Sequence, residues 1–211
     1  QGMWKFKNLT GDDNVIDEND KTVIGNAQPK FYGGLNNSFT YKGFDLSIFL
    51  TFSYGNEVLN ATKLVTSKVG SLNYNALDVM NSSNRWMTIN SDGQKVTDPG
   101  ELAALNAGKT VAAYHDAQQG DNYIHSWAVE DASYLKLSNV TLGYTFPKKL
   151  IARVGLKNLR LYATGNNLLT WTKYSGFDPE VSTMKSGLTP GVDFGAYPLS
   201  RSFIFGLNVA F

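Results

Sequence analysis

The last eleven residues constrain the fold of this chain more than any other segment, because side-chain type alternates along them. Apolar or aromatic residues take every second position: Phe203, Phe205, Leu207, Val209 and Phe211. Small or polar residues lie between them, with Ile204 as the one apolar exception. Side chains of a strand point to opposite faces in turn, so this run predicts a strand with one apolar face. An aromatic edge of this kind is rare in soluble sheets and typical of lipid-facing barrel walls, although a strand of an ordinary β-sandwich is the alternative.

Composition excludes several functional classes. The 19 Lys and Arg residues balance 18 Asp and Glu without clustering, which argues against nucleic-acid binding. Cysteine is absent, so disulfides, zinc–thiolate sites and thiol nucleophiles are excluded. The 20 Gly, 12 Phe, 11 Tyr and 4 Trp residues favour a β-rich chain with many turns. No apolar run approaches the roughly 20 residues of a membrane helix. The chain opens on Gln1 without a signal peptide, and we expect a processed or partial piece of a longer protein.

Alternation predicts four further strands. Residues 31–54 hold two alternating runs separated by Lys42-Gly43, which is the pattern of a β-hairpin. Residues 131–169 hold two more strands with a short turn after Pro147. The apolar parity slips inside the first of these, which predicts a β-bulge near Ser138-Asn139. The terminal strand occupies residues 198–211.

The connections alternate between long and short. Residues 1–30 form an acidic loop, and residues 55–130 and 170–197 form two further long loops. Outer-membrane barrels combine long extracellular loops with short periplasmic turns, so we expect these three segments to be extracellular. About five strands cannot close a barrel, and an open sheet edge is not viable in lipid. These patterns therefore predict that the chain forms the last part of the wall of a larger barrel.

Several stretches resemble, in order and spacing, the C-terminal end of the SusC/RagA family, the TonB-dependent outer-membrane transporters of Bacteroidetes. They are residues 23–31, 41–49, 129–147, 159–168, 170–180 and 197–203, and together they leave only the 60–120 region unmatched. The resemblance implies an all-β antiparallel fold, with these residues forming the last five or so strands of a barrel of about 22 strands.

The resemblance also implies a function and partners. It implies a multi-pass protein of the bacterial outer membrane, in contact with lipid, that takes up oligosaccharides or peptides as nutrients. A SusD-like surface lipoprotein would cap the barrel, and TonB would supply energy through an N-terminal region that this chain lacks. A plug, also N-terminal in that family, would fill the barrel. The alternative from another class is a soluble or surface-tethered all-β carbohydrate-binding module.

The acidic loop is a candidate calcium site. Residues 8–20 lie where the family often has a calcium-loop-like Asp/Asn/Gly stretch, and oxygen ligands at alternating positions suit Ca²⁺. In this chain Asn8 and Thr10 replace two of the expected residues, and Asp13-Asn14 shift the later acids by one. Asp12, Asp17 and Asp20 are the best candidate ligands, and a solvated acidic loop without metal is the favoured alternative. No cofactor is otherwise required.

Aromatic and polar side chains give two further sets of candidates. Trp86, Trp171 and Tyr174 could stack on a solute, as could Trp127 and Tyr197, although interfacial girdles and loop packing also use these residue types. Lys136, Arg160, Tyr162 and Asn166 would face the lumen, where they could line a solute path or, as we favour, contact the plug. The alternating Phe203–Phe211 run has the features of a barrel-assembly signal.

Enzymatic chemistry is not expected. His115 and His125 are the only histidines, and neither lies in a recognisable triad with a nucleophile and an acid. The adjacency of His115 and Asp116 carries no implied geometry. Phosphate-binding loops, dinucleotide fingerprints and zinc motifs are absent from the sequence.

Overall fold

The structure, a computed structural model, describes residues 2–11, 15–67, 75–113, 124–183 and 187–211. It divides the chain into two compact units. The first unit comprises Gln1–Ile24 and Asn60–Ala128, and the second comprises Gly25–Leu59 and Val129–Phe211. None of the described helices is long and apolar enough to cross a membrane.

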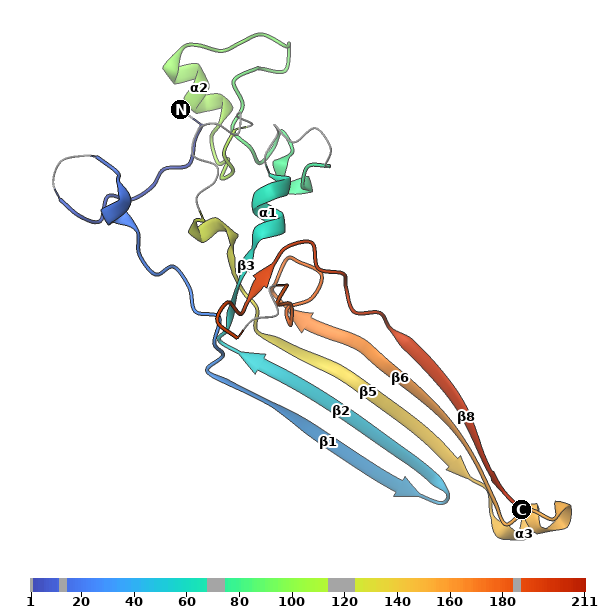
Figure 1. The fold of residues 1–211 in the computed structure, drawn as a ribbon. Helices are drawn as coiled ribbons and strands as arrows, with labels where there is room; N and C mark the ends of the chain where they lie inside the picture. The colour runs from blue at the N-terminus through green and yellow to red at the C-terminus, as the bar shows by residue number, and fades with distance from the viewer. Residues whose placement is uncertain (1, 12–14, 68–74, 114–123, 184–186) are drawn as a thin grey trace. The chain divides into compact units, whose positions relative to one another are not determined.

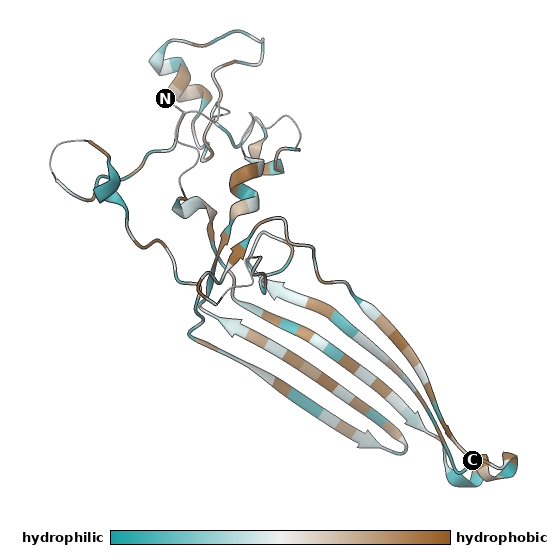
Figure 2. Ribbon diagram, viewed as in Figure 1, coloured by the Kyte–Doolittle hydropathy of each residue, from teal (hydrophilic) through white to brown (hydrophobic). Residues whose placement is uncertain are grey.

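The second unit is built on a five-stranded antiparallel sheet (Figure 1). Its strands, in spatial order, are β1 (Phe31–Tyr41), β2 (Phe44–Tyr54), β5 (Tyr134–Thr145), β6 (Asn158–Thr172) and β8 (Ser202–Ala210). Each strand pairs with its neighbours only, so β1 and β8 are the two edges of an open sheet. Bands of contrasting hydropathy follow one another along the strands, as the alternation of the sequence predicts (Figure 2).

The predicted hairpin and bulge are both present. Lys42 and Gly43 have φ values of 47° and 90°, which fits a tight two-residue turn whose twist matches that of the strands. Against β6, two residues, Asn167 and Leu168, lie opposite a single residue of β5. Against β2, Asn139 and Leu137 pair with the adjacent residues Phe49 and Leu50, so the extra residue is Ser138. Its hydroxyl lies 2.7 Å from Thr51 Oγ1, which gives the bulged residue a polar partner.

One end of the sheet carries only short connections. The Lys42-Gly43 turn lies there, as do α3 (Lys148–Ile151), η4 (Ala152–Val154) and the C-terminus (Figure 1). Gly155 ends this short helical link with a φ of 77°, a left-handed value that glycine adopts without strain. The long connections leave from the opposite end of the sheet, as predicted.

A small second sheet corrects two predicted boundaries. Its strands are β4 (Val129–Asp131), β3 (Glu57–Asn60) and β7 (Val192–Asp193), in the order β4-β3-β7. The segments expected to be plain loops, residues 55–130 and 170–197, therefore contribute strands. Val58, Ala132 and Tyr174 form a buried cluster beside them, with Val181 packed against it. Burial of these apolar groups gives the loops a core that period-two alternation in the sequence does not reveal.

Strand β6 is longer than predicted. Alternation suggested that it ends near residue 169, but pairing continues through Thr170, Trp171 and Thr172 opposite Lys136, Leu135 and Tyr134. The extension follows from β5, which begins at Tyr134 and leaves backbone groups that these three residues satisfy.

The first unit contains short helices. They are η1 (Glu18–Asp20), α1 (Ala61–Thr66), η2 (Asp78–Met80), α2 (Pro99–Leu105) and η3 (Ser126–Ala128). Helix α2 begins at Pro99 because Asp98 caps it and Pro99 takes its first turn. Asn106 is buried here, and its side chain bonds the backbone of Met87 and Leu102.

Candidate functional site

One face of the large sheet is apolar and exposed. A typical row across all five strands reads Phe39, Leu46, Leu142, Ala163 and Phe205. Phe39 is 58 % exposed, Leu142 49 % and Phe205 80 %. Exposing so many large apolar side chains to water is unfavourable, so this face is suited to contact with lipid or another apolar surface.

The opposite face carries polar side chains that lie over glycines. The adjoining row reads Asp45, Gly143, Tyr162 and Gly206 across β2, β5, β6 and β8. Arg160 reaches over Gly143 and donates to both Asp45 oxygens, from Nε at 3.1 Å and from Nη2 at 2.5 Å. A Cβ at Gly143 would lie 2.5 Å from both groups, so the missing side chain makes this cross-strand pair possible.

Tyr162 and Asn166 extend the same polar surface. The Tyr162 ring lies over Gly206, where a Cβ would overlap it, and the Arg160 guanidinium lies 5.1 Å from the centre of that ring. Asn166 accepts from Asn139 Nδ2 at 2.7 Å and donates to Ser202 at 3.0 Å. The structure thus brings three of the four predicted lumen-facing residues together on one polar face.

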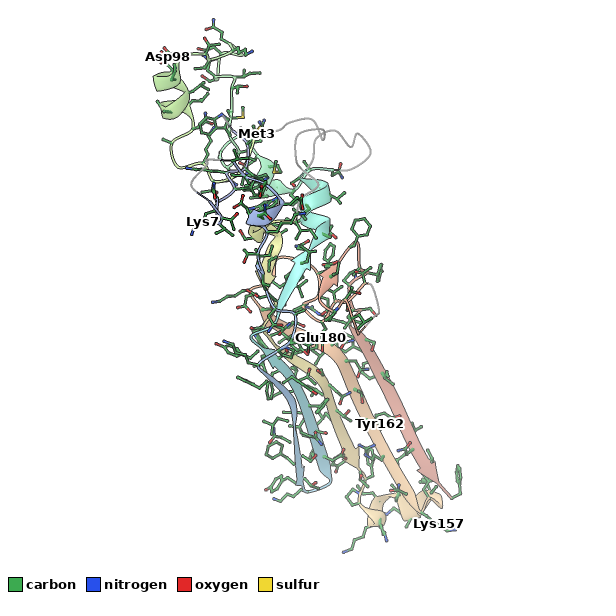
Figure 3. The ribbon with its side chains drawn as sticks, turned by 60° about the vertical axis from the view of Figure 1, so that its left-hand side comes forward. Met3, Lys7, Asp98, Lys157, Tyr162 and Glu180 are labelled. Atoms are coloured by element: carbon green, nitrogen blue, oxygen red, sulfur yellow. The ribbon has the colours of Figure 1, made fainter. Side chains whose placement is uncertain are left out.

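Lys136, the fourth, corrects the prediction. It shares the polar face but is only 3 % exposed, because a loop of the same chain covers it. Its ammonium group pairs with Glu180 and lies 3.8 Å from Asp178. Glu180 also accepts from the Tyr134 hydroxyl at 2.5 Å, and it lies at the end of the sheet away from Lys157 (Figure 3). A buried cation needs such partners, so Lys136 anchors this loop and is not open to a solute or plug.

The three aromatic candidates, Trp86, Trp171 and Tyr174, have different surroundings. Tyr174 is 5 % exposed and donates from its hydroxyl to Asp193 at 2.6 Å. Burial and the negative Asp193 raise the pKa of Tyr174, so it remains a neutral donor. Trp171 is 52 % exposed but lies on β6, opposite Leu135 on the apolar face, which is a position suited to an interfacial girdle. Trp86 is half-buried in the first unit, and its ring abuts Gly2.

The acidic loop is closed by hydrogen bonds to Asp20. Its carboxylate accepts from the backbone N–H groups of Leu9, Thr10 and Asp17 at 2.6 to 3.0 Å. These donors lower the pKa of Asp20, the N–H of Asp17 most strongly. Asp17 accepts from the N–H of Asn19 and caps η1. Asp12, together with His115 and Asp116, lies outside the described residues.

Calcium binding in this loop therefore stays a prediction. In the structure, Asp17 and Asp20 have another role, because they accept hydrogen bonds from backbone N–H groups of the loop. Among the described residues no group of three His, Cys, Asp or Glu side chains is arranged to hold a metal. The oxygens of Asp20 point at backbone donors, and a cation there would have to replace those bonds.

The first unit contains an aromatic cavity, and the sequence analysis did not predict that its residues come together in one site. It has a volume of 1280 Å³, and Trp4, Phe6, His125 and Trp127 lie on its wall. Trp127 was among the predicted stacking candidates, whereas Trp4 was not. The two tryptophans are more than 120 residues apart in the sequence, so no local pattern links them.

The chain resembles known proteins over nearly its whole length. It is 35 % identical to TonB-dependent receptor P3 of Formosa agariphila over 98 % of this chain and 19 % of that receptor. It is 28 % identical to TonB-dependent receptor SusC of Bacteroides thetaiotaomicron over 100 % of this chain and 18 % of SusC. The chain thus spans about a fifth of the length of these relatives. No protein-family model matches it.

Solved structures agree with the sequence comparison. The structure of the RagAB peptide transporter aligns with a TM-score of 0.66 and 27 % identity, over 90 % of this chain and 18 % of that one. The RagAB peptide importer in its open-open state aligns with a TM-score of 0.64 and 25 % identity, over 90 % of this chain and 18 % of that one.

The sheet and these alignments together define the class of the protein. An open antiparallel sheet with one exposed apolar face and one polar face is part of the wall of a transmembrane β-barrel. Within that class, the chain is a segment of a SusC/RagA-type TonB-dependent receptor.

Proposed function

We propose that the chain forms part of the barrel wall of a bacterial outer-membrane transporter that imports oligosaccharides or peptides. The observation that carries this proposal is the exposed apolar face of the sheet, which runs across all five strands from Phe39 to Phe205. Antiparallel strands satisfy their backbone groups inside the sheet, so only such a wall, closed by further strands, is stable in hydrocarbon. In this role the chain is a passive wall with loops, and it performs no chemical step.

The partners follow from the relatives. The curated relatives are named TonB-dependent receptors, which supports TonB as the source of energy for uptake. The RagAB structures are described as a peptide transporter and importer, which supports a peptide as one class of solute. The resemblance to the SusC/RagA family supports oligosaccharides as the other class and a SusD-like lipoprotein as the surface partner. The polar face around Arg160 and Tyr162 would then contact the plug.

The test is the intact mass and folding state of the polypeptide extracted from native outer membranes. We expect a species about five times the mass of this chain, because the chain spans 19 % of receptor P3. Barrels resist detergent until they are heated, so its gel mobility should change on boiling. A species of the size of this chain, released without detergent, would contradict the proposal and support a soluble binding module.

A second measurement tests transport itself. Deleting the gene segment that encodes the chain should abolish TonB-dependent uptake of the solute, and restoring it should return uptake. Retained uptake by cells whose receptor lacks these strands would contradict the proposed function.

A further inference from the structure

We propose that the aromatic cavity of the first unit binds the apolar face of a neutral oligosaccharide. This inference rests on the proposed function and assigns it a solute class and a binding surface in this chain. The residues that line the cavity come from three described stretches, 4–9, 16–24 and 124–127, all of which belong to the first unit. Its volume of 1280 Å³ is at or above the range of roughly 300 to 1,000 Å³ of small-molecule sites, which favours an oligomer over a single small molecule.

The aromatic wall of the cavity has rings packed on one another. The Trp4 ring lies 4.7 Å from the His125 ring and 5.1 Å from the Trp127 ring, with tilts of 44° and 41°. The Phe6 ring meets His125 edge-on at 6.1 Å. Rings held by their neighbours lose little conformational freedom on binding, so this wall is preorganised for a flat apolar partner.

Trp127 is held from a further direction. The Lys63 ammonium lies 4.2 Å from the centre of the Trp127 ring and donates to the Trp127 carbonyl at 3.0 Å. This cation–π contact fixes the orientation of the ring. Trp127 therefore keeps both contacts with Lys63 when Trp4 is replaced, so Trp4 is the ring chosen for substitution.

The charged lining selects against an ionic ligand. It comprises three lysines and three acids: Lys5, Lys7, Lys21, Asp17, Glu18 and Asp20. Glu18 and Lys21 pair with each other, and the Asp20 carboxylate is engaged by backbone N–H groups. Charges that balance within the lining provide donors and acceptors for hydroxyl groups without a net field for an anion or a cation.

A neutral oligosaccharide fits both the aromatic wall and the charged part of the lining. The C–H groups on one side of a pyranose ring form a flat apolar surface that packs on an indole, and its hydroxyl groups point outward to polar side chains. A peptide of the same length would bring charged termini, which a charge-balanced cavity does not favour. The combination of stacked rings, balanced charge and large volume therefore favours the sugar.

The experiment measures binding to the full-length receptor in detergent, without TonB. The probes are maltohexaose, cellohexaose, xylohexaose and mannohexaose, with hexagalacturonate as the anionic match and a neutral hexapeptide as the competitor class. Affinity is measured by calorimetry on the wild type and on Trp4→Ala, Trp4→Phe and Phe6→Ala variants. Phe177→Ala is the matched control, because Phe177 is 80 % exposed in a loop of the second unit.

We expect at least one neutral hexasaccharide to bind, and Trp4→Ala to weaken it about tenfold, a change of about 1.4 kcal/mol. Trp4→Phe should retain most of the affinity because it keeps a stacking ring, Phe6→Ala should lower the affinity, and Phe177→Ala should leave it unchanged. The inference is overturned if no neutral hexasaccharide binds, if Trp4→Ala has no effect, or if hexagalacturonate or the peptide binds more tightly.

Failure of this inference can be told apart from failure of the proposed function. Only receptor that is extracted from the outer membrane and changes mobility on boiling enters the binding experiment. Receptor that passes this criterion and carries its solute, but does not bind through Trp4, contradicts the cavity assignment alone.

Discussion

Single glycines decide how the polar side chains of the sheet are arranged. Gly143 and Gly206 alternate with Asp45 and Tyr162 in one cross-strand row, so each large side chain lies beside a position without one. The Arg160 guanidinium crosses one glycine and the Tyr162 ring covers the other. The polar network therefore depends on residues that have no side chain and would not be chosen as functional from their chemistry.

Replacing Gly206 by alanine tests this dependence. The added methyl group would overlap the Tyr162 ring, so we expect Gly206→Ala to lower the free energy of unfolding by about 1–3 kcal/mol. Urea unfolding of the refolded receptor in lipid vesicles measures the change. Gly187→Ala is the control, since its added methyl group meets nothing within 4 Å. Adding Tyr162→Ala to Gly206→Ala should recover part of the loss, and no recovery would contradict the assigned contact.

Asp20 gives the acidic loop a pH dependence. Its pKa is lowered by the N–H groups that it accepts, so the closed loop is favoured above the ordinary range of aspartate and opens as the pH falls through the lowered pKa. Amide exchange of Leu9, Thr10 and Asp17, corrected for the intrinsic effect of pH, should therefore rise at low pH. Asp20→Ala should raise exchange above the lowered pKa of Asp20, where the wild-type carboxylate is charged, and change it little below that pKa, whereas Asp92→Ala, in another loop, should have no effect. Equal protection with and without the Asp20 carboxylate would show that other contacts close the loop.

At the scale of elements, polar contacts attach the long loops to strands, and the one between Tyr174 and Asp193 is buried. Lys136 on β5 pairs with Glu180 and lies near Asp178. Tyr174 donates to Asp193 of the short strand β7, and the backbone N–H of Ser175 donates to Glu130 in β4. These contacts connect the segment after β6 to strands far from it in the sequence, and they hold the small sheet over its buried cluster.

Replacing Lys136 by methionine should detach this segment. The substitution keeps most of the apolar stem but leaves two partly buried carboxylates without their cation, so we expect a loss of about 1–3 kcal/mol and faster proteolysis within residues 173–183. Adding Glu180→Gln and Asp178→Asn should restore part of the protection, because the unpaired charges are then removed. Unchanged cleavage in Lys136→Met would indicate that the Tyr174 cluster alone holds the loop.

At the scale of the whole molecule, the two faces of the sheet differ in the environment to which they are suited. Leu142 lies half-exposed on the apolar face, and the neighbouring Thr141 lies on the polar face, where its hydroxyl is 2.8 Å from that of Thr164. Because Thr141 and Leu142 are adjacent on one strand and point to opposite faces, substitutions at these two positions compare the two environments at nearly the same depth in the membrane.

Arginine substitutions at these two positions measure the difference. Leu142→Arg places a charge in the lipid-facing surface and should lower the free energy of unfolding in vesicles by about 2 kcal/mol, within the depth-dependent range of such substitutions. Thr141→Arg should cost less, because its face is polar. Urea titration of both variants in the same vesicles gives the comparison. A larger loss for Thr141→Arg would reverse the assignment of the faces.

The sequence by itself determined the features that follow from local periodicity. Alternation along Phe44–Tyr54, the Lys42-Gly43 turn and the parity slip at Ser138 each depend on neighbouring residues, and the hairpin and the bulge are confirmed. The open sheet with an apolar face also follows, because a period of two assigns each residue to a face.

Only the tertiary structure decided which polar and aromatic side chains meet. Arg160 and Asp45 are 115 residues apart in the sequence, and Lys136 pairs with a loop residue 44 positions away. Trp4 and Trp127 lie near the two ends of the sequence of the first unit, yet their rings are in contact. The physical reason is that strand register and loop packing fix these distances through contacts between distant segments, and local pattern carries no information about them. The lengthening of β6 to Thr172 has the same origin, since the start of β5 determines it.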